Sequence, residues 1–219
     1  MDTSLTSPSS SNRDNLSAAG SAGNISSIAE FVAAIDALMD TTSDTATIVT
    51  AVQSQLAALL KIPNLLSEEH RFSSPDRYQS HVIAVAPRHH FSVVSLVWLP
   101  GQATPIHDHI CWCVVGVLEG EEHEERFNLR EDESGNRWLV PTVESSVSPG
   151  GVTSVLVPPT ENIHRVRNAC QHLAISIHVY GADINLCGSS INECFDGLPQ
   201  FPDSKPGRPV AWRLTKPAK

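Results

Sequence analysis

The hydrophobic and polar positions divide the chain into a short helical part and a longer part rich in strands. Apolar residues recur at helical spacing from residue 28 to 38 and from 48 to 60, which predicts two amphipathic helices. Ser27 followed three residues later by Glu30 has the form of a capping box at the start of the first helix. Pro63 marks the end of the second. We expect both helices to be packing elements, because no residue on them suggests chemistry.

After Tyr78 the pattern changes to short runs rich in Val and Ile, separated by Gly and Pro. Such runs cover residues 92–98, 112–118, 152–157 and 173–180. Many short strands at this spacing are typical of a closed antiparallel barrel or a jelly roll. We therefore predict a mainly β fold with an N-terminal helical segment.

The composition of the two ends completes the predicted domain organisation. The first residues are rich in Ser, Gly and Asn and poor in apolar side chains, which is typical of disorder. The predicted parts are a disordered tail (1–24), a helical cap (25–66), a barrel (67–198) and a C-terminal extension that packs on the surface (199–219).

Charge and cysteine usage narrow the function classes. A formal net charge of -9 argues against a nucleic-acid partner, and no apolar stretch is long enough to span a membrane. The N-terminus lacks the basic and then apolar pattern of a secretory signal, so we expect a cytoplasmic protein. Five cysteines are too few and odd in number for a disulfide framework, which favours free thiols in a reducing compartment.

Three histidines form the first candidate site. His107 and His109 are two residues apart, so on a strand they share one face, while Asp108 between them faces away. His164 can add a third imidazole from another strand. Three imidazoles with open coordination positions suit a catalytic metal, and iron fits this ligand set. The alternative is that these are unconnected surface or core histidines.

The spacing around the histidines resembles two cupin motifs. Gly101, His107, His109 and Gly120 follow the first motif, with Cys113 at the position where most cupins place a glutamate ligand. The residues around His164 resemble the second motif. Without the glutamate, three neutral imidazoles leave the charge of a divalent metal uncompensated, which favours an anionic ligand from the substrate such as a thiolate.

Ser176, His178 and Tyr180 form a second constellation. On a regular strand these three polar residues share one face and can form a hydrogen-bond relay, in which Ser orients His and His orients the Tyr hydroxyl. The alternative is an exposed polar face of a strand.

Taken in order along the chain, these residues resemble the thiol dioxygenases of the cysteine dioxygenase type I family. The resemblance implies a cupin barrel with ferrous iron on His107, His109 and His164. It implies that both atoms of dioxygen are added to a small thiol to give a sulfinic acid. Ser176, His178 and Tyr180 would then form an outer relay that positions substrate and oxygen. Some members cross-link a cysteine at the position of Cys113 to the active-site tyrosine, here Tyr180. On a regular strand Cys111 shares the face of Cys113 and is a competing partner, and inert core cysteines are the alternative.

The chain departs from the family where the substrate carboxylate is bound. Cysteine-specific members have an arginine where Ser80 stands, and relatives acting on 3-mercaptopropionate use an arginine that 181–195 lacks, with Asn192 near its place. Without a bidentate arginine, the sequence does not identify which thiol is the substrate. We expect Arg165 and Arg167 to point away from the site.

A third group of titratable residues surrounds His123. It stands among four glutamates, Glu121, Glu122, Glu124 and Glu125. A solvated charged turn is favoured over a second metal site.

The sequence thus predicts an iron-dependent thiol dioxygenase that uses a small thiol, such as cysteine or a related mercapto compound, and dioxygen. Two alternatives stay open. One is another non-haem iron cupin oxygenase with a non-thiol substrate, and the other is a cupin that binds metal or a small ligand without catalysis. The oligomeric state stays open.

Overall fold

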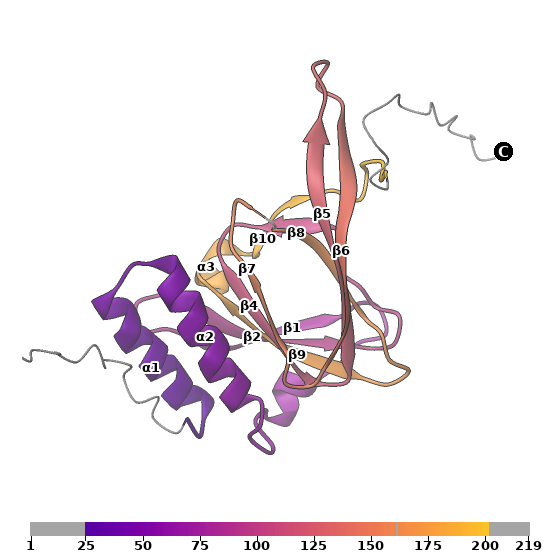
Figure 1. Ribbon diagram of the computed structural model, residues 1–219. Coiled ribbons are helices and arrows are strands. Elements are labelled where there is room, and N and C mark those ends of the chain that lie inside the picture. The colour runs from indigo at the N-terminus through magenta and orange to yellow at the C-terminus, as the bar shows by residue number, and fades with distance from the viewer. Residues whose placement is uncertain (1–24, 161, 202–219) are drawn as a thin grey trace, which may run out of the picture.

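The computed structural model describes residues 25–160 and 162–201 (Figure 1). The predicted tail and most of the predicted C-terminal extension lie outside the described residues. Among the residues described, helices come first and strands dominate the rest, in agreement with the predicted mainly β fold.

Both predicted helices are present, as α1 (Ile28–Thr41) and α2 (Thr45–Leu59). The Ser27 hydroxyl caps α1 by accepting a hydrogen bond from the Glu30 backbone N–H at 3.2 Å. The Glu30 carboxylate returns to the backbone N–H of Ser26, one residue before the position that a capping box requires. Two short helices follow, a 3₁₀ helix (Glu68–Arg71) and α3 (Ile184–Cys187).

Within the described residues, ten strands form two antiparallel five-stranded sheets. The first sheet contains, in spatial order, β1 (Gln79–Val85), β2 (Ser92–Trp98), β9 (Ala174–Tyr180), β4 (Cys113–Glu119) and β7 (Thr153–Leu156). The second contains β10 (Ile191–Cys194), β3 (His107–His109), β8 (Ile163–Asn168), β5 (Glu121–Glu131) and β6 (Arg137–Pro149). The sheets enclose a barrel, from which the β5–β6 hairpin extends (Figure 1).

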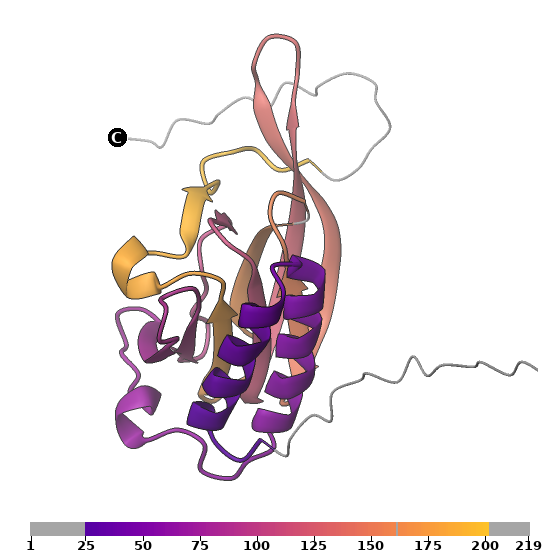
Figure 2. The ribbon, with the colours of Figure 1, turned by 90° about the vertical axis from the view of Figure 1, so that its left-hand side faces the viewer.

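The helices cover the outer face of the first sheet (Figures 1 and 2). Alternate β9 residues Ile175, Ile177 and Val179 are fully buried in the cluster that the helices complete. Gly116 on β4 permits the close approach, because a Cβ there would lie 2.5 Å from a Leu60 methyl group. With one face of β9 committed to this core, its other residues point into the barrel.

The expected charged turn at residues 121–125 is wrong. These residues begin β5, which pairs with β6 on one side and β8 on the other. Glu122 is only 4% exposed. Pairing on both sides supplies the backbone hydrogen bonds that a turn would take from water, so a charged stretch can lie inside a sheet.

Candidate metal centre and relay

His107, His109 and His164 converge inside the barrel. His107 lies directly opposite His164 in the β3–β8 pairing, and His109 follows on the same face of β3. One ring nitrogen from each of the three lies within 4.8 Å of the others, and all three residues are buried. The structure therefore brings together the three histidines that the strand alternation placed on one face. Asp108 points away, as expected, and accepts hydrogen bonds from Asn192 and from the Glu193 backbone.

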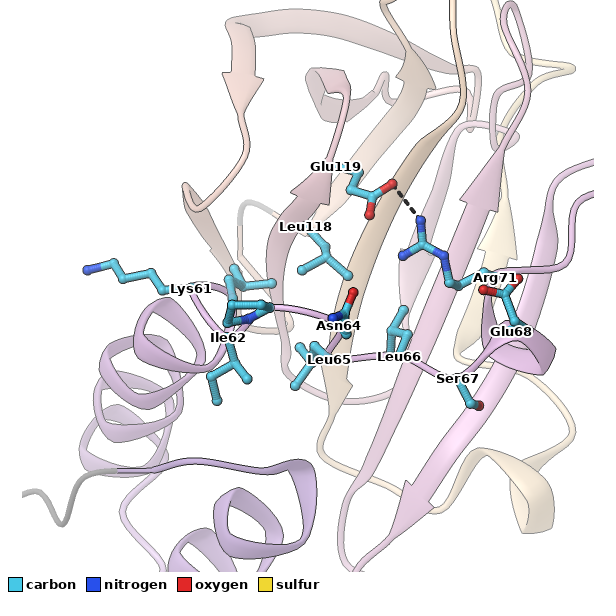
Figure 3. A pocket seen from close by; sticks show the side chains of 12 residues that line it. Lys61, Ile62, Asn64, Leu65, Leu66, Ser67, Glu68, Arg71, Leu118 and Glu119 are labelled. Carbon is cyan, nitrogen blue, oxygen red and sulfur yellow. Dashed lines mark hydrogen bonds and ion pairs between the residues drawn. The ribbon is translucent and has the colours of Figure 1, made fainter.

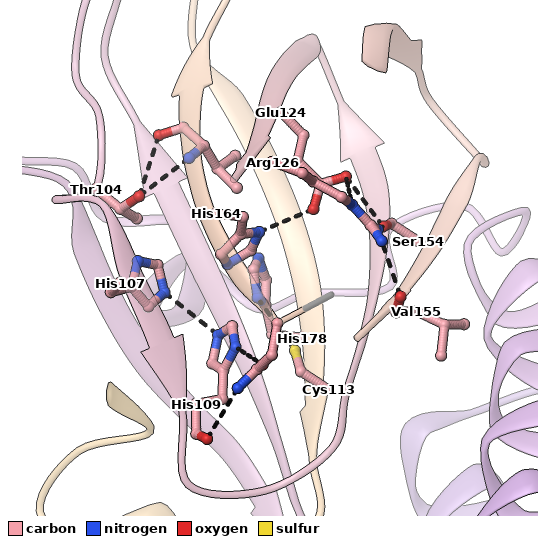
Figure 4. A network of polar contacts seen from close by, with 12 residues as sticks. Thr104, His107, His109, Cys113, Glu124, Arg126, Ser154, Val155, His164 and His178 are labelled. Carbon is pink, nitrogen blue, oxygen red and sulfur yellow. Dashed lines mark hydrogen bonds and ion pairs between the residues drawn. The ribbon is translucent and has the colours of Figure 1, made fainter. Parts of the chain in front are cut away.

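The outward nitrogen of each histidine has its own acceptor. Nδ1 lies 2.9 Å from the Pro105 carbonyl oxygen for His107, 3.0 Å from the Asn162 amide oxygen for His109, and 2.8 Å from a Glu124 carboxylate oxygen for His164. Because all three partners are acceptors, Nδ1 carries the proton and Nε2 keeps a free lone pair. Figure 4 shows His107 and His109 meeting through their Nε2 atoms, which are 3.3 Å apart.

Burial keeps these ligands in the form that binds a metal. Burial, together with the neighbouring His164, lowers the pKa of His107 to about 4 and that of His109 to about 2. Imidazole must be neutral to coordinate a metal. His107 and His109 are neutral at pH 7, so a metal ion need not displace a proton from them, and the donor set fits a divalent transition metal.

Glu124 and Asn162 are functional candidates that the sequence reasoning missed. Burial alone would raise the pKa of Glu124, but the hydrogen bond and charge of His164, together with Arg126, outweigh it and lower the pKa to about 2. Asn162 is buried beside His109 and also donates to the His109 carbonyl oxygen. A signal was available for Asn162, because it stands two residues before His164, the spacing of residues on one face of an extended chain. Glu124 becomes visible only once β5 is known to pair with β8.

Ser176, His178 and Tyr180 form a connected relay on the inner face of β9. Ser176 Oγ lies 2.9 Å from His178 Nε2, and the Tyr180 hydroxyl lies 3.1 Å from His178 Nδ1. Their exposed fractions are 0%, 3% and 6%, which excludes an exposed polar face. Burial also lowers the pKa of His178 to about 3, so its imidazole is neutral at pH 7.

Cys113 lies beside this relay. It stands directly opposite Tyr180 in the β4–β9 pairing, and its sulfur is 3.9 Å from His178 Nδ1. Burial raises the pKa of the Cys113 thiol, while a hydrogen bond with Tyr180 opposes this shift. Cys111 was expected to share this face on a regular strand. That premise is wrong, because β4 begins at Cys113 and Cys111 lies in a bend before it.

A cavity of about 210 Å³ connects the histidines to the relay. Its lining includes the three convergent histidines, His178 and Tyr180. The remaining lining residues are hydroxyl-bearing or apolar, namely Tyr78, Ser80, Leu96, Thr104, Val166, Ile184, Gly188, Ser189, Ser190 and Ile191. No lysine or arginine lines this cavity among the described residues. A cavity of this volume holds a small molecule only.

The remaining candidates lie outside this cavity. Arg165 forms an ion pair with Glu125 and Arg167 is exposed, so both point away from the site as expected. Within the described residues, His123 and its neighbours form no metal-ligand cluster. A larger groove of about 600 Å³ runs from the end of α2 to β4, crossed by the Arg71–Glu119 ion pair (Figure 3). It contains none of the convergent histidines.

Comparisons with known proteins agree with this geometry. The family model for cysteine dioxygenase type I matches residues 20–189. The fold is similar to an uncharacterized conserved protein with a double-stranded β-helix domain from Klebsiella pneumoniae, at 17% identity and a TM-score of 0.39, over 54% of this chain and 89% of that one. It is also similar to an RmlC-like cupin from Desulfovibrio desulfuricans, at 20% identity and a TM-score of 0.35, over 52% of this chain and 92% of that one. The two five-stranded sheets and the N-terminal helices by themselves confirm the predicted mainly β fold. In the described part of the chain, no helix is long and apolar enough to cross a membrane.

Proposed function

Because the chain belongs to the cysteine dioxygenase type I family, we propose that it is an iron-dependent thiol dioxygenase. It oxidises a small thiol, cysteine or a related mercapto compound, to the sulfinic acid with dioxygen. The observation that carries the proposal is the set of three buried histidines, each with its outward nitrogen bonded and its inward nitrogen free. Such a set is preorganised to hold a metal and to leave positions open for other ligands.

His107, His109 and His164 would hold Fe(II) through their Nε2 atoms. Iron supplies the chemistry that joins dioxygen to a thiolate sulfur, and the protein's part is to orient the reactants. The ligand cluster contains no anionic side chain, so a substrate thiolate fits its charge requirement. Cys113 does not join the cluster, although it occupies the position of the glutamate ligand of other cupins.

The residues of the relay act next to the metal ligands. The Tyr180 hydroxyl reaches the cavity and would hydrogen-bond the substrate or oxygen, while His178 holds Tyr180 and Ser176 holds His178. The direct pairing of Cys113 with Tyr180 supports a thioether cross-link between them. Its formation joins the sulfur to the phenol ring, removes two hydrogen atoms and uses dioxygen as the oxidant, so a mass measurement detects it.

The cavity lining bears on the choice of thiol. Ser80 lines the cavity at the place of the arginine in cysteine-specific members. Asn192 donates a hydrogen bond to Asp108 and is not among the residues that line the cavity. Hydroxyl groups therefore replace a guanidinium as the polar groups available to the substrate. We infer that turnover does not depend on a substrate carboxylate.

The free thiols support a proposal for the cellular location. All five cysteines are free, and a reducing compartment such as the cytoplasm keeps exposed thiols such as Cys187 and Cys194 unpaired. A cytoplasmic location is part of the proposal.

The test is oxygen consumption by anaerobically iron-loaded protein. Cysteine, 3-mercaptopropionate, cysteamine and 2-mercaptoethanol are offered in parallel, and the sulfinic acid products are identified by mass spectrometry. Uptake of one dioxygen per sulfinate formed is the expected result. Iron that stays bound while none of the thiols consumes oxygen would contradict the proposal.

A further inference from the structure

Glu122 is a buried carboxyl group at the far end of the relay. It lies on β5 opposite Asn168 of β8 and alternates with Glu124, so its side chain points into the barrel. The Ser176 hydroxyl and the Trp98 indole N–H both lie beside its carboxyl group. With Glu122 included, the chain of polar groups has four members, Glu122, Ser176, His178 and Tyr180. It begins on one sheet and continues on the other.

The surroundings of Glu122 allow both of its protonation states near neutral pH. Burial raises the pKa of Glu122 to about 7, contacts with Ser176 and Trp98 oppose the shift, and the negative charge of Glu124 adds to it. Asn168, directly opposite on β8, is uncharged. His178, the next member of the relay after Ser176, has a neutral imidazole at pH 7. Glu122 Oε1 has no hydrogen-bond partner among the described residues, a costly state for a buried ionised oxygen.

Ser176 has only one hydroxyl proton to give. The Trp98 indole can only donate, and its Nε1 lies 3.3 Å from Ser176 Oγ, where it uses one lone pair of that oxygen. The hydroxyl proton can then go to His178 Nε2, 2.9 Å away, or turn to the neighbouring Glu122 carboxyl group. The partner that does not receive this proton must itself donate to Ser176 Oγ.

We propose that Glu122 is a positioning residue whose protonation state sets the direction of every hydrogen bond in the relay. When Glu122 is protonated, it donates to Ser176, Ser176 donates to His178 Nε2, and His178 Nδ1–H donates to the Tyr180 oxygen. The Tyr180 proton is then free to point into the cavity. This inference rests on the proposed function for its catalytic meaning, because Tyr180 acts there as the donor.

When Glu122 is ionised, all these directions reverse. Ser176 donates to the carboxylate, His178 donates from Nε2 to Ser176, and His178 Nδ1 accepts the Tyr180 proton. Tyr180 then offers only a lone pair to the cavity. Turnover that needs the Tyr180 proton therefore falls as pH rises through the pKa of Glu122, by at most about tenfold per pH unit for a single ionisation.

The test uses the full-length protein loaded with Zn(II), a diamagnetic ion, and ¹⁵N-labelled on histidine. The ring nitrogen shifts of His178, assigned by their absence from His178→Asn, report its tautomer between about pH 6 and 8. The wild type is expected to change from the Nδ1–H to the Nε2–H tautomer as pH rises. Glu122→Gln, whose amide can donate but not ionise, is expected to keep Nδ1–H throughout. Glu121→Gln, at an exposed position next to it on β5, should behave as the wild type.

A His178 tautomer that does not respond to pH in the wild type, or that responds equally in Glu122→Gln, would overturn the proposal. If Glu122→Gln does not fold, the wild-type titration still tests the proposal. Infrared spectroscopy of the wild type is the second measurement. A band of a protonated carboxyl group that disappears near neutral pH is expected, and a spectrum without such a band overturns the proposal. Neither readout needs turnover. A tautomer change without thiol-dependent oxygen uptake supports the role of Glu122 and counts against the dioxygenase assignment alone.

Discussion

Two walls of the barrel interior face the same cavity and hold their polar groups differently. In the histidine wall, formed by His107, His109 and His164, every outward nitrogen has an acceptor of its own. In the relay wall, formed by Ser176, His178 and Tyr180, the groups bond to one another, and each can act as donor or acceptor. Separate acceptors give the histidine wall one fixed arrangement, which suits a metal site. Shared protons give the relay wall two possible arrangements of its hydrogen bonds, which suits proton transfer.

The largest expected effect comes from breaking the histidine wall. His164→Ala removes one of the three proposed ligands and should abolish iron retention and oxygen uptake, measured by metal analysis and an oxygen electrode. His172→Ala changes an exposed histidine outside the cavity and is the matched control. A His164→Ala protein that retains iron and activity would refute the ligand assignment.

Breaking the relay wall should leave iron in place. Tyr180→Phe removes the hydroxyl that reaches the cavity and should lower kcat by about 10²-fold to 10⁴-fold, the range for loss of a positioned proton donor. Iron content and the unfolding midpoint serve as controls, because the phenyl ring keeps the packing. Wild-type kcat in Tyr180→Phe would remove the tyrosine from the mechanism.

Weakening the support of the histidine wall should have a smaller effect. Glu124→Gln removes the charge that orients His164 and should weaken iron binding by about 10-fold to 100-fold, as is usual for partners of metal ligands. Glu125→Gln is the control, since Glu125 pairs with Arg165 outside the cavity. The comparison is made by competition with a chelator, and equal affinities for the two variants would show that Glu124 does not support the site.

The relay wall also makes stability depend on pH. The pKa of His178 is lowered to about 3 in the folded protein, against about 6.5 when unfolded. Below pH 6.5 the unfolded state therefore binds a proton at His178 that the folded state does not, so this histidine lowers the free energy of unfolding as pH falls. Glu122, whose pKa is raised to about 7, acts in the opposite direction. Between pH 7.5 and 5 the loss due to His178 is on the order of 2 kcal/mol. Over this pH range, metal-free wild-type protein should therefore lose more free energy of unfolding in urea than His178→Asn, by the His178 contribution. Parallel pH dependences of the two proteins would contradict it.

The smallest effect concerns the substrate. Without a guanidinium among the described lining residues, kcat/KM for 2-mercaptoethanol and 3-mercaptopropionate should differ by less than about tenfold, since a charged hydrogen bond contributes about 1.5–3 kcal/mol. Ser80→Arg should then favour the carboxylate-bearing thiol. A strong preference for 3-mercaptopropionate in the wild type would point to a cation elsewhere in the chain.

Strand alternation was enough to predict much of the two walls. A period of two puts His107 with His109, and Ser176 with His178 and Tyr180, whatever the fold around them. The same reasoning failed at residues 121–125, because charge suggested solvent while pairing on both sides placed Glu122 and Glu124 inside. It failed at Cys111 because it assumed a strand where the chain bends.

The sequence by itself determined the two helices, the mainly β class, the three histidines that converge and the members of the relay. All of these depend on local periodicity and on the chemistry of single side chains. Only the tertiary structure decided that Glu124 orients His164, that Cys113 faces Tyr180 and that Glu122 meets Ser176. Those pairs join strands far apart in the chain, and their register is set by burial of the whole sheet, which local spacing does not encode.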